Sequence, residues 1–407
     1  MTKKSDAPAI RFKGFSDAWE QRKLGELVDR VVRKNINNES TLPLTISAQY
    51  GLVDQITYFN NRVASRDVSN YYLVLNGEFA YNKSTSDGYP FGAVKRLDLY
   101  EKGVLSTLYI VFAPKKEQQI DSDYLTVFFD TDRWHKGVAE RAAEGARNHG
   151  LLNISAEDFF DIDLSVPKDI VEQKQIGAFI RQLDNLITLH QRKFEKLTNV
   201  KKSMLEKMFP QNGSSYPEIR FKGFTDPWEQ RKLGEMGSVS MCRRIFKEQT
   251  SETGDIPFYK IGTFGADPDA FISRELFEEY KSKYPYPQKG DILISASGSI
   301  GRTVEFAGNN EYFQDSNIVW LNHDERLSNP FLKCFYSVVK WAGIEGSTIK
   351  RLYNDNILNT VICMPSVPEQ KRIGLFFENL DNLITLHQRE LEKLQNIKKS
   401  MLEKMFV

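Results

Sequence analysis

The chain has 407 residues, of which 41% are apolar and 27% are charged, and its formal net charge is +1. This length and balance are typical of a globular protein with two or three domains. The chain lacks the excess of basic residues that many stand-alone nucleic-acid binders have. No run of about 18 apolar residues occurs, so we expect no membrane-spanning helix. A local basic face remains compatible with a neutral total charge.

The N-terminus, MTKKSDAPAI, is basic but has no apolar segment, so we interpret residues 1–10 as a flexible extension and not as a secretory signal. The three cysteines, Cys242, Cys334 and Cys363, are scattered and indicate neither a disulfide framework nor a zinc site. A reducing cytoplasm is therefore the expected compartment.

Two segments of the chain occur twice almost unchanged. Residues 11–26 and 220–235 differ at two of sixteen positions, and residues 183–209 and 380–406 match at 23 of 27 positions. Apart from an EQK-x-I-G lead-in before each second block, the intervening 156 and 144 residues show little similarity. A recent duplication without functional meaning would diverge evenly, so we favour a common frame that holds two different binding domains.

Residues 11–168 are predicted to form a first strand-rich domain. Apolar runs such as YYLVL alternate with turn residues, and DSDYLTVFFDTDRWHKGVAERA is typical of a helix, so we expect an α+β fold. Arg pairs with guanine and Asn with adenine, while Ser contacts either base. The candidate DNA-binding residues in the polar loops are Lys83, Ser84, Arg147 and Asn148. An ordinary turn is the open alternative for each of them.

Residues 169–212 are predicted to form a long helix that Pro210 and Gly213 end. Its apolar residues recur at alternating steps of four and three, as in the seam of a coiled coil. The seam residues are Leu183, Ile187, His190, Phe194, Leu197 and Met204. Lys201 interrupts the seam, and we expect Val200 to take over its contact. We interpret His190 as a seam residue and not as a metal ligand.

Residues 213–365 are predicted to form a second strand-rich domain on the same plan. The run KGDILISASGSIGRTVEFAG indicates strands joined by a polar loop, and NPFLKCFYSVVKWAG indicates a helix. By the same base-pairing chemistry, the candidate DNA-binding residues are Ser297, Ser299, Arg302, Lys350 and Arg351.

Residues 366–407 are predicted to form a second long helix with the same seam. Its seam residues are Leu380, Ile384, His387, Leu391, Leu394 and Met401, and Lys398 interrupts it. Neither helix can bury its apolar stripe alone, so we expect the two to pack as an antiparallel coiled coil that separates the domains. Their basic C-terminal faces fit either a solvated surface or a contact with DNA or a partner.

Sequence motifs of catalysis do not occur in the chain. It has no Walker A motif, no G-x-G-x-x-G, no Asn-Pro-Pro-aromatic tetrapeptide and no H-E-x-x-H. We therefore expect no catalytic residue, cofactor or metal in this chain. A nuclease with loosely spaced carboxylates is the remaining enzymatic alternative.

The repeated motifs resemble the specificity subunits of type I restriction-modification systems. The FKGF-[ST]-D-x-W-E-Q-R-K-L-G-E blocks are similar to the openings of that family's target recognition domains. The runs that contain Glu172-Gln173-Lys174 and Glu369-Gln370-Lys371 are similar to the starts of its conserved helices, and ISASGSIGRTVEF is similar to an element of its recognition domains. The resemblance covers nearly the whole chain.

This resemblance implies a DNA-binding subunit without a catalytic site. Each domain would recognise one half of a split, asymmetric sequence in double-stranded DNA, and the helices would set the gap between the halves. Two modification subunits that use S-adenosylmethionine would bind the frame, and restriction subunits that need ATP and Mg²⁺ would join them. The alternative is a coiled-coil scaffold without DNA contact. Whether the N-terminal segment meets the C-terminal helix is left open.

Overall fold

A computed structural model shows that the chain divides into two compact units. It describes residues 7–47, 50–86, 88–117, 119–142, 150, 152–211, 213–342 and 351–407. The first unit comprises residues 1–190 and 389–407, and the second comprises residues 191–388. Each unit combines a strand-rich part with parts of two long helices. We call these strand-rich parts the first head (residues 10–166) and the second head (residues 219–364).

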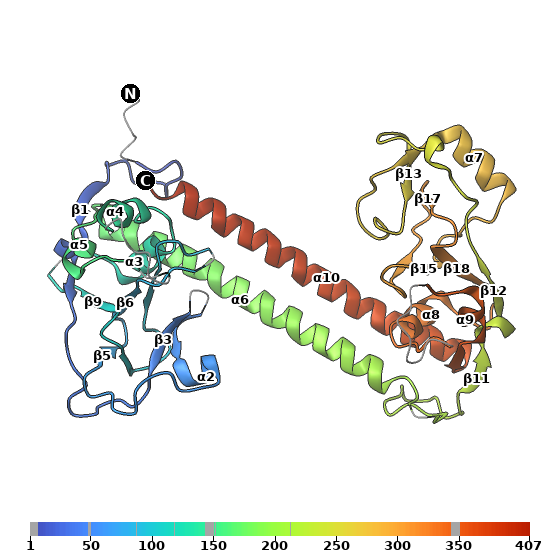
Figure 1. Ribbon diagram of the computed structural model, residues 1–407, viewed down its shortest axis with the longest axis horizontal. Helices are drawn as coiled ribbons and strands as arrows, with labels where there is room; N and C mark the ends of the chain where they lie inside the picture. Colours follow the sequence, from blue (N-terminus) through green and yellow to red (C-terminus); the bar gives the residue numbers. More distant parts are fainter. Residues whose placement is uncertain are drawn as a thin grey trace. The chain divides into compact units, whose positions relative to one another are not determined.

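Short elements build the first head (Figure 1). Its strands are β1 (Glu20–Lys23), β2 (Val28–Arg30), β3 (Leu44–Ser47), β4 (Gly51–Asp54), β5 (Tyr72–Leu75), β6 (Phe79–Asn82), β7 (Ala93–Arg96), β8 (Lys102–Leu105), β9 (Ile110–Pro114) and β10 (Asp163–Val166). Its helices are α1 (Leu24–Leu27), α2 (Gln55–Phe59), α3 (Ser122–Phe129), α4 (His135–Arg141) and α5 (Ala156–Phe160).

The second head is built in the same way. Its strands are β11 (Glu229–Lys232), β12 (Gly237–Ser240), β13 (Ile256–Tyr259), β14 (Phe271–Ile272), β15 (Ile292–Ser295), β16 (Thr303–Glu305), β17 (Tyr312–Phe313), β18 (Ile318–His323) and β19 (Val361–Met364). Its helices are α7 (Arg274–Lys283), α8 (Asn329–Tyr336) and α9 (Asn354–Asn359), with 3-10 turns at Leu233–Glu235 and Lys247–Gln249. The long helices are α6 (Ile170–Lys207) and α10 (Val367–Lys404).

The two heads share the strand order of their four-stranded sheet although their sequences and their smaller sheets differ. The first head has an antiparallel sheet in the order β2-β9-β6-β7, and the second has β12-β18-β15-β16. In each head a further antiparallel pair, β1-β10 or β11-β19, joins the repeated opening block to the strand that leads into a long helix. The expected α+β class with two strand-rich domains and two packed long helices is confirmed.

Each four-stranded sheet lies between two apolar cores. On β6, Phe79 and Tyr81 belong to a core shared with the ends of the long helices, whereas Ala80 belongs to an outer core. On β15, Ile294 belongs to the core shared with the long helices, and Leu293 belongs to the outer core. Successive strand side chains point to opposite faces of a sheet, which explains why these central strands are apolar throughout. The heads therefore share an inner core design and differ in the outer one.

The two long helices run antiparallel. In the first unit, Ile180 and Leu183 near the start of α6 share a core with Met401 and Met405 near the end of α10. In the second unit, Met204 near the end of α6 shares a core with residues near the start of α10, including Phe377 and Leu380. The buried or half-buried residues between them recur at steps of three and four: Leu183, Ile187, His190, Phe194, Leu197, Leu380, Ile384, His387, Leu391 and Leu394. None of the helices in the described part of the chain is long and apolar enough to cross a membrane.

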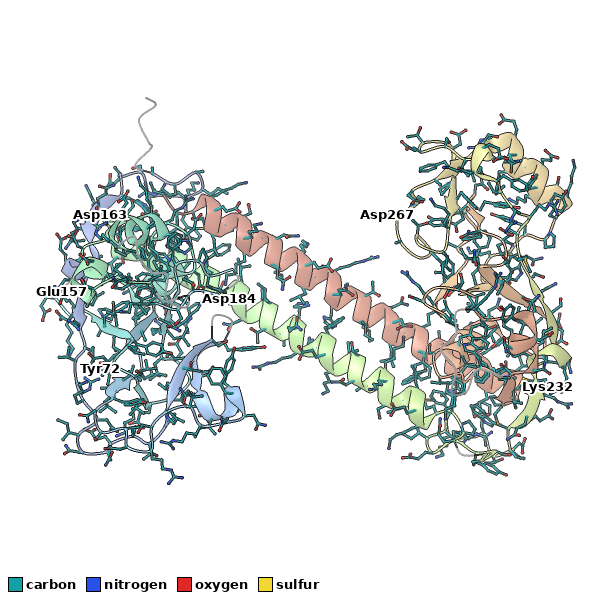
Figure 2. All side chains as sticks on the ribbon, in the orientation of Figure 1. Tyr72, Glu157, Asp163, Asp184, Lys232 and Asp267 are labelled. Atoms are coloured by element: carbon teal, nitrogen blue, oxygen red, sulfur yellow. The ribbon has the colours of Figure 1, made fainter. Side chains whose placement is uncertain are left out.

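Lysines interrupt the apolar seam, and each pairs with an aspartate of the other helix. Lys201 Nζ lies 2.5 Å from Asp381 Oδ1, and Lys398 Nζ lies 2.6 Å from Asp184 Oδ1. Figure 2 labels Asp184 on α6. The partner of each lysine is thus a carboxylate of the facing helix, so the gap in the seam is filled by an ion pair.

The opening block of each repeat is fixed to a long helix by a buried ion pair. Arg11 Nε and Nη2 donate to the two carboxylate oxygens of Glu172 at 2.6 and 2.8 Å. Arg220 binds Glu369 in the same bidentate way at 2.7 and 2.8 Å. Both glutamate side chains are 1% exposed, so the pairing compensates a charge that would otherwise be buried alone.

The glutamine after each of these glutamates binds the head through backbone atoms. Gln173 accepts a hydrogen bond from the backbone N–H of Asp121 and donates to the carbonyls of Gln119 and Pro167. Gln370 makes the same kinds of contact in the second unit, including one with the backbone N–H of Ser328. Backbone groups are independent of side-chain identity, so the frame can hold heads of different sequence.

A glycine in each lead-in lets a head helix approach a long helix closely. A Cβ atom on Gly177 would lie 2.9 to 3.0 Å from Asp123 and Tyr124, and one on Gly374 would lie 2.4 Å from Pro330. The repeated E-Q-K-x-I-G sequence therefore supplies an ion pair, a backbone contact and a close approach.

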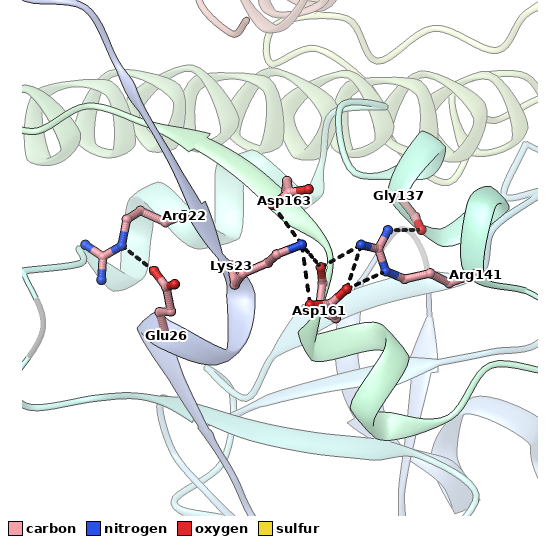
Figure 3. Close-up of polar contacts among 7 residues, drawn as sticks. All are labelled: Arg22, Lys23, Glu26, Gly137, Arg141, Asp161 and Asp163. Carbon is pink, nitrogen blue, oxygen red and sulfur yellow. Dashed lines mark hydrogen bonds and ion pairs between the residues drawn. The ribbon is translucent and has the colours of Figure 1, made fainter.

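Figure 3 shows a second link between the opening block and the end of the first head. Lys23 on β1 lies 3.1 Å from Asp163 and donates to the backbone carbonyl of Asp161, and Arg141 on α4 binds the Asp161 carboxylate. Hydrogen bonds from Arg141 and Lys23 lower the pKa of Asp161. In the second head, Lys232 (labelled in Figure 2) binds Asn359 at 3.1 Å.

The ends of the chain meet in the first unit. The backbone N–H of Ile10 donates to the carbonyl of Lys404 at 3.0 Å, and the ring of Trp19 contacts Phe406 edge-on. In the second unit, Ile219 donates to Lys207, and Trp228 contacts Phe209. The N-terminal segment therefore packs on the C-terminal helix, a contact that the sequence had left open.

One helix expected from the sequence is divided. The run that begins at Asp121 forms α3 and α4, separated by residues 130–134. The hydroxyl of Thr131 is buried and donates to the carbonyl of Phe128 at 2.6 Å, which ends α3 with a local side-chain bond. The signal for this turn was the run Asp130-Thr131-Asp132, because such polar residues are typical of turns.

Candidate nucleic-acid interface

Two segments far apart in the first head lie side by side at one end of its sheet. The segment after β6 begins at Lys83, and its backbone carbonyl accepts a hydrogen bond from Leu152 N–H at 3.0 Å. Two residues on, Thr85 donates from both its N–H and its hydroxyl to the carbonyl of Gly150. The segment after β6 and the residues Gly150 and Leu152 are therefore held side by side.

The sequence candidates of the first head fall on these two segments. Ser84 is exposed, and Lys83 is half-buried with its Nζ 3.4 Å from the carbonyl of Ile154. Arg147 and Asn148 lie outside the described residues. The contact between Thr85 and Gly150 holds the flanks of the two candidate loops together.

The second head brings equivalent segments together. Ala296, the first residue after β15, accepts a hydrogen bond from Leu352 N–H at 2.7 Å and donates its own N–H to Asn317 at 2.7 Å. Because β15 and β18 are antiparallel, the residues that follow β15 lie beside those that precede β18. Three chain segments thus meet at this end of the sheet.

Four candidates of the second head are described, and they fall into two groups. Ser297 and Arg351 lie opposite each other in an isolated β-bridge. Arg302 donates to the carbonyl of Gly265 at 3.1 Å, and Ser299 accepts a hydrogen bond from the hydroxyl of Ser295 through its backbone carbonyl. Lys350 lies outside the described residues. Whether any of these residues contacts DNA stays a prediction.

Asn317 was missed by the sequence reasoning. Its Oδ1 accepts a hydrogen bond from the Ser297 hydroxyl at 2.9 Å, and the carbonyl of the preceding Ser316 accepts one from Arg351 Nη2 at 2.9 Å. The only signal in the sequence was a polar QDSN run before an apolar strand, which is also typical of a turn.

Cations are concentrated at this end of the second head. Arg243 and Arg244, which follow β12, are exposed, and Arg244 Nε lies 3.1 Å from the carboxylate of Asp315. Arg244 and Arg351 thus both contact the segment before β18, while Arg302 binds the carbonyl of Gly265. Positive groups among Ser and Asn side chains suit a surface that contacts phosphates and base edges.

The buried thiols have no features of a catalytic nucleophile. Burial raises the pKa of Cys242 and of Cys334 to about 12, so both thiols stay protonated near neutral pH. Within the described ranges, no group of three or more His, Cys, Asp or Glu side chains is placed to hold a metal ion.

The long helices expose leucines at repeated positions. Leu186 and Leu189 on α6 are 44% and 46% exposed, and Leu383 and Leu386 on α10 are 44% and 53% exposed. Each pair stands three residues apart and therefore on one face of its helix. The same apolar surface is present once in each unit.

The sequence of the chain matches the model of a known protein family. A family model for the type I restriction modification DNA specificity domain matches residues 17–199 and 225–396, which together are most of the chain. Each match joins one strand-rich head to much of the helix that follows it.

Individual proteins of known description are also similar. A putative type I restriction enzyme specificity subunit from Haemophilus influenzae is 61% identical over 158 residues, which are 38% of this chain and 41% of that protein. This likeness thus spans less than half the length of the Haemophilus protein. A type I restriction enzyme specificity subunit from Methanocaldococcus jannaschii is 23% identical over 85% of this chain and 82% of that protein.

A solved structure has the same fold. The S subunit of a type I restriction-modification system from M. genitalium aligns with a TM-score of 0.61 at 16% identity, over 98% of this chain and 99% of that chain. At this identity the likeness concerns the fold alone.

Proposed function

Because the chain belongs to the type I restriction-modification DNA specificity family, we propose that each of its heads recognises one half of a bipartite, asymmetric DNA sequence. The chain is the DNA specificity subunit of such a system, a subunit without catalytic activity of its own. The family implies assembly with partner subunits and with DNA.

The observation that supports this proposal most is that two heads with the same four-stranded sheet present different loops on the same frame. The sheets β2-β9-β6-β7 and β12-β18-β15-β16 are equivalent, and Arg11–Glu172 and Arg220–Glu369 are equivalent contacts. Two recognition surfaces that differ in their loops are suited to two different half-sites.

We assign the gap between the half-sites to the helix pair. The pairs Lys201–Asp381 and Lys398–Asp184 each join the two helices within one unit, and in this proposal the number of helical residues between the heads sets the gap. Insertion of a few helical residues near Thr198 is then expected to change the gap length.

Two modification subunits bind the helices in this proposal. The exposed leucine pairs Leu186–Leu189 and Leu383–Leu386 occur once in each unit, so one kind of partner surface finds two equivalent positions. S-adenosylmethionine would bind the modification subunits, and ATP and Mg²⁺ would bind restriction subunits that join the complex. Base flipping and chemistry then belong to these partners in the cytoplasm.

Replacement of one variable region tests the proposal. Residues 27–165 are exchanged for the corresponding region of a related subunit, and the variant is co-produced with its modification subunit. Sequencing of methylated DNA is expected to show a new first half-site, an unchanged second half-site and an unchanged gap. Changes in both halves, or in neither, would contradict the proposal. A chain that binds its modification subunit in a complex without sequence-selective DNA binding would favour the coiled-coil scaffold instead.

A further inference from the structure

We propose that Arg351 and Asn317 contact base edges in the half-site of the second head, and that Ser297 and Ser316 hold them in position. This inference rests on the proposed function and names the residues that determine specificity in one head. It comes from the way in which three segments meet at one end of the sheet.

Arg351 is held by one edge of its guanidinium. Its Nη2 donates to the carbonyl of Ser316 at 2.9 Å, and its Cζ lies 6.0 Å from the ring centre of Tyr353. Within the described part of the chain, no carboxylate forms an ion pair with it. An arginine with a fixed side chain and free N–H donors is suited to the two acceptors that guanine presents in the major groove.

The orientation of the Asn317 amide is fixed by Ser297. The Ser297 hydroxyl donates to Oδ1 at 2.9 Å, which assigns the other amide position to the NH₂ group. Among the described residues this NH₂ group has no hydrogen-bond acceptor. An amide that offers one donor and a second lone pair on its oxygen matches the N7 and N6 groups of adenine.

The backbone at Ser316 is in an uncommon conformation. Its φ is +52°, in the left-handed region that residues with a side chain seldom adopt. This conformation belongs to the residue whose carbonyl binds Arg351 and which precedes Asn317. Such conformations cluster at binding sites, where the surrounding structure holds them in place.

A hollow beside Arg351 favours a base edge over a phosphate. It has a volume of about 370 Å³, and its walls include Ser316, Arg351, Tyr353 and Asp355. The carboxylate of Asp355 would repel a phosphate, whereas base edges carry both donors and acceptors. The Tyr353 side chain is 64% exposed and adds an apolar ring to the rim of the hollow.

The experiment measures base preference and not only binding. The full chain is produced in complex with its modification subunit, and the complex methylates a DNA library randomised over both half-sites. Arg351→Lys keeps the charge but removes the fork of donors, and Asn317→Leu removes the amide. Each is expected to reduce discrimination about 10- to 100-fold at one position of the second half-site only. Ser297→Ala is expected to reduce it less, at the position that Asn317 sets.

Arg274→Lys is the matched control, because Arg274 is a half-exposed arginine on α7 of the same head. It is expected to leave every base preference unchanged, and melting temperatures identify variants that fail to fold. Unchanged base preferences in folded Arg351→Lys and Asn317→Leu, or an equal loss of methylation on all sequences, would overturn the inference. A parent complex without any sequence preference would overturn the proposed function itself.

Discussion

The residues repeated in both halves of the chain make contacts that also occur twice. The Arg11–Glu172 pair has its counterpart in Arg220–Glu369, and both are bidentate with an almost fully buried carboxylate. Removal of one partner leaves the other charge buried and unpaired, which is far more destabilising than loss of an exposed pair. This structural role is enough to explain why these residues are the same in both repeated blocks, and DNA binding is not needed to explain it.

Arg11→Ala is expected to destabilise the first unit by about 3 kcal/mol, because Glu172 is left without its counter-ion. Urea unfolding of the full chain measures the effect. Arg22→Ala is the control, since its partner Glu26 is half-exposed and the pair contributes less than about 1 kcal/mol. Addition of Glu172→Gln to Arg11→Ala should recover part of the loss. Equal effects of Arg11→Ala and Arg22→Ala would refute the assignment.

Asp123 links the first head to α6 in a pH-dependent manner. Burial by itself would raise the pKa of Asp123, but hydrogen bonds from Arg181 and Arg96 outweigh it and lower that pKa below 3.8. The ionised Asp123 carboxylate therefore stabilises the folded state fully above pH 3.8, and this stabilisation is lost as the pH falls through the lowered pKa of Asp123. Asp123→Asn should be less stable than the parent at neutral pH, and the difference in melting temperature should vanish in acid. A difference that is constant with pH would exclude this mechanism.

The sequence indicated residue types for a DNA interface but not their arrangement, and their contact with DNA stays a prediction. Ser297 and Arg351 were both candidates, but nothing in the sequence indicated that they face each other across a bridge. Asn317 was missed because its role depends on a hydrogen bond from a residue twenty positions earlier. Contacts of this kind follow from the order of strands in a sheet, which local composition does not determine.

At the scale of elements, the long helices were the most predictable part of the chain. Their spacing of three and four residues is a local property, and α6 and α10 begin and end within a few residues of the expected limits. The ion pair between Lys201 and Asp381 was not expected from the sequence, whereas the expected contact of Val200, which is half-buried, stays a prediction. The signal was present, since an aspartate directly follows the first seam residue in both repeats.

Reversal of charge tests this ion pair. Lys201→Asp places two carboxylates opposite each other and is expected to destabilise the second unit by up to about 1 kcal/mol, because the pair is partly exposed. Asp381→Lys in the same chain should restore stability to within a few tenths of a kcal/mol. Thermal unfolding of the parent, both single variants and the double variant gives the coupling energy. Additive effects of the two changes would show that the side chains do not interact.

At the scale of the whole molecule, the resemblance seen in the motifs is confirmed by the family match over both repeats. The expected α+β class is confirmed as well, but the sequence did not indicate that the two dissimilar heads share one strand order. Sheet order depends on contacts between residues far apart in the chain, and the two heads reach it with different side chains. The frame tolerates this because Gln173 and Gln370 bind only backbone groups of the heads.

A chain with the same head in both positions tests the molecule as a whole. Residues 27–165 replace residues 236–363, so that both repeated blocks frame the first head. The helices that join the two positions are antiparallel, so two identical heads would recognise identical half-sites in opposite orientations. The methylated sequence is therefore expected to become an inverted repeat of the first half-site, with the parental gap, because the helices are unchanged. Sequencing of methylated DNA measures this, and the parent protein with its asymmetric site is the control. A direct repeat would contradict the antiparallel arrangement, and retention of the original second half-site would contradict the assignment of one half-site to each head.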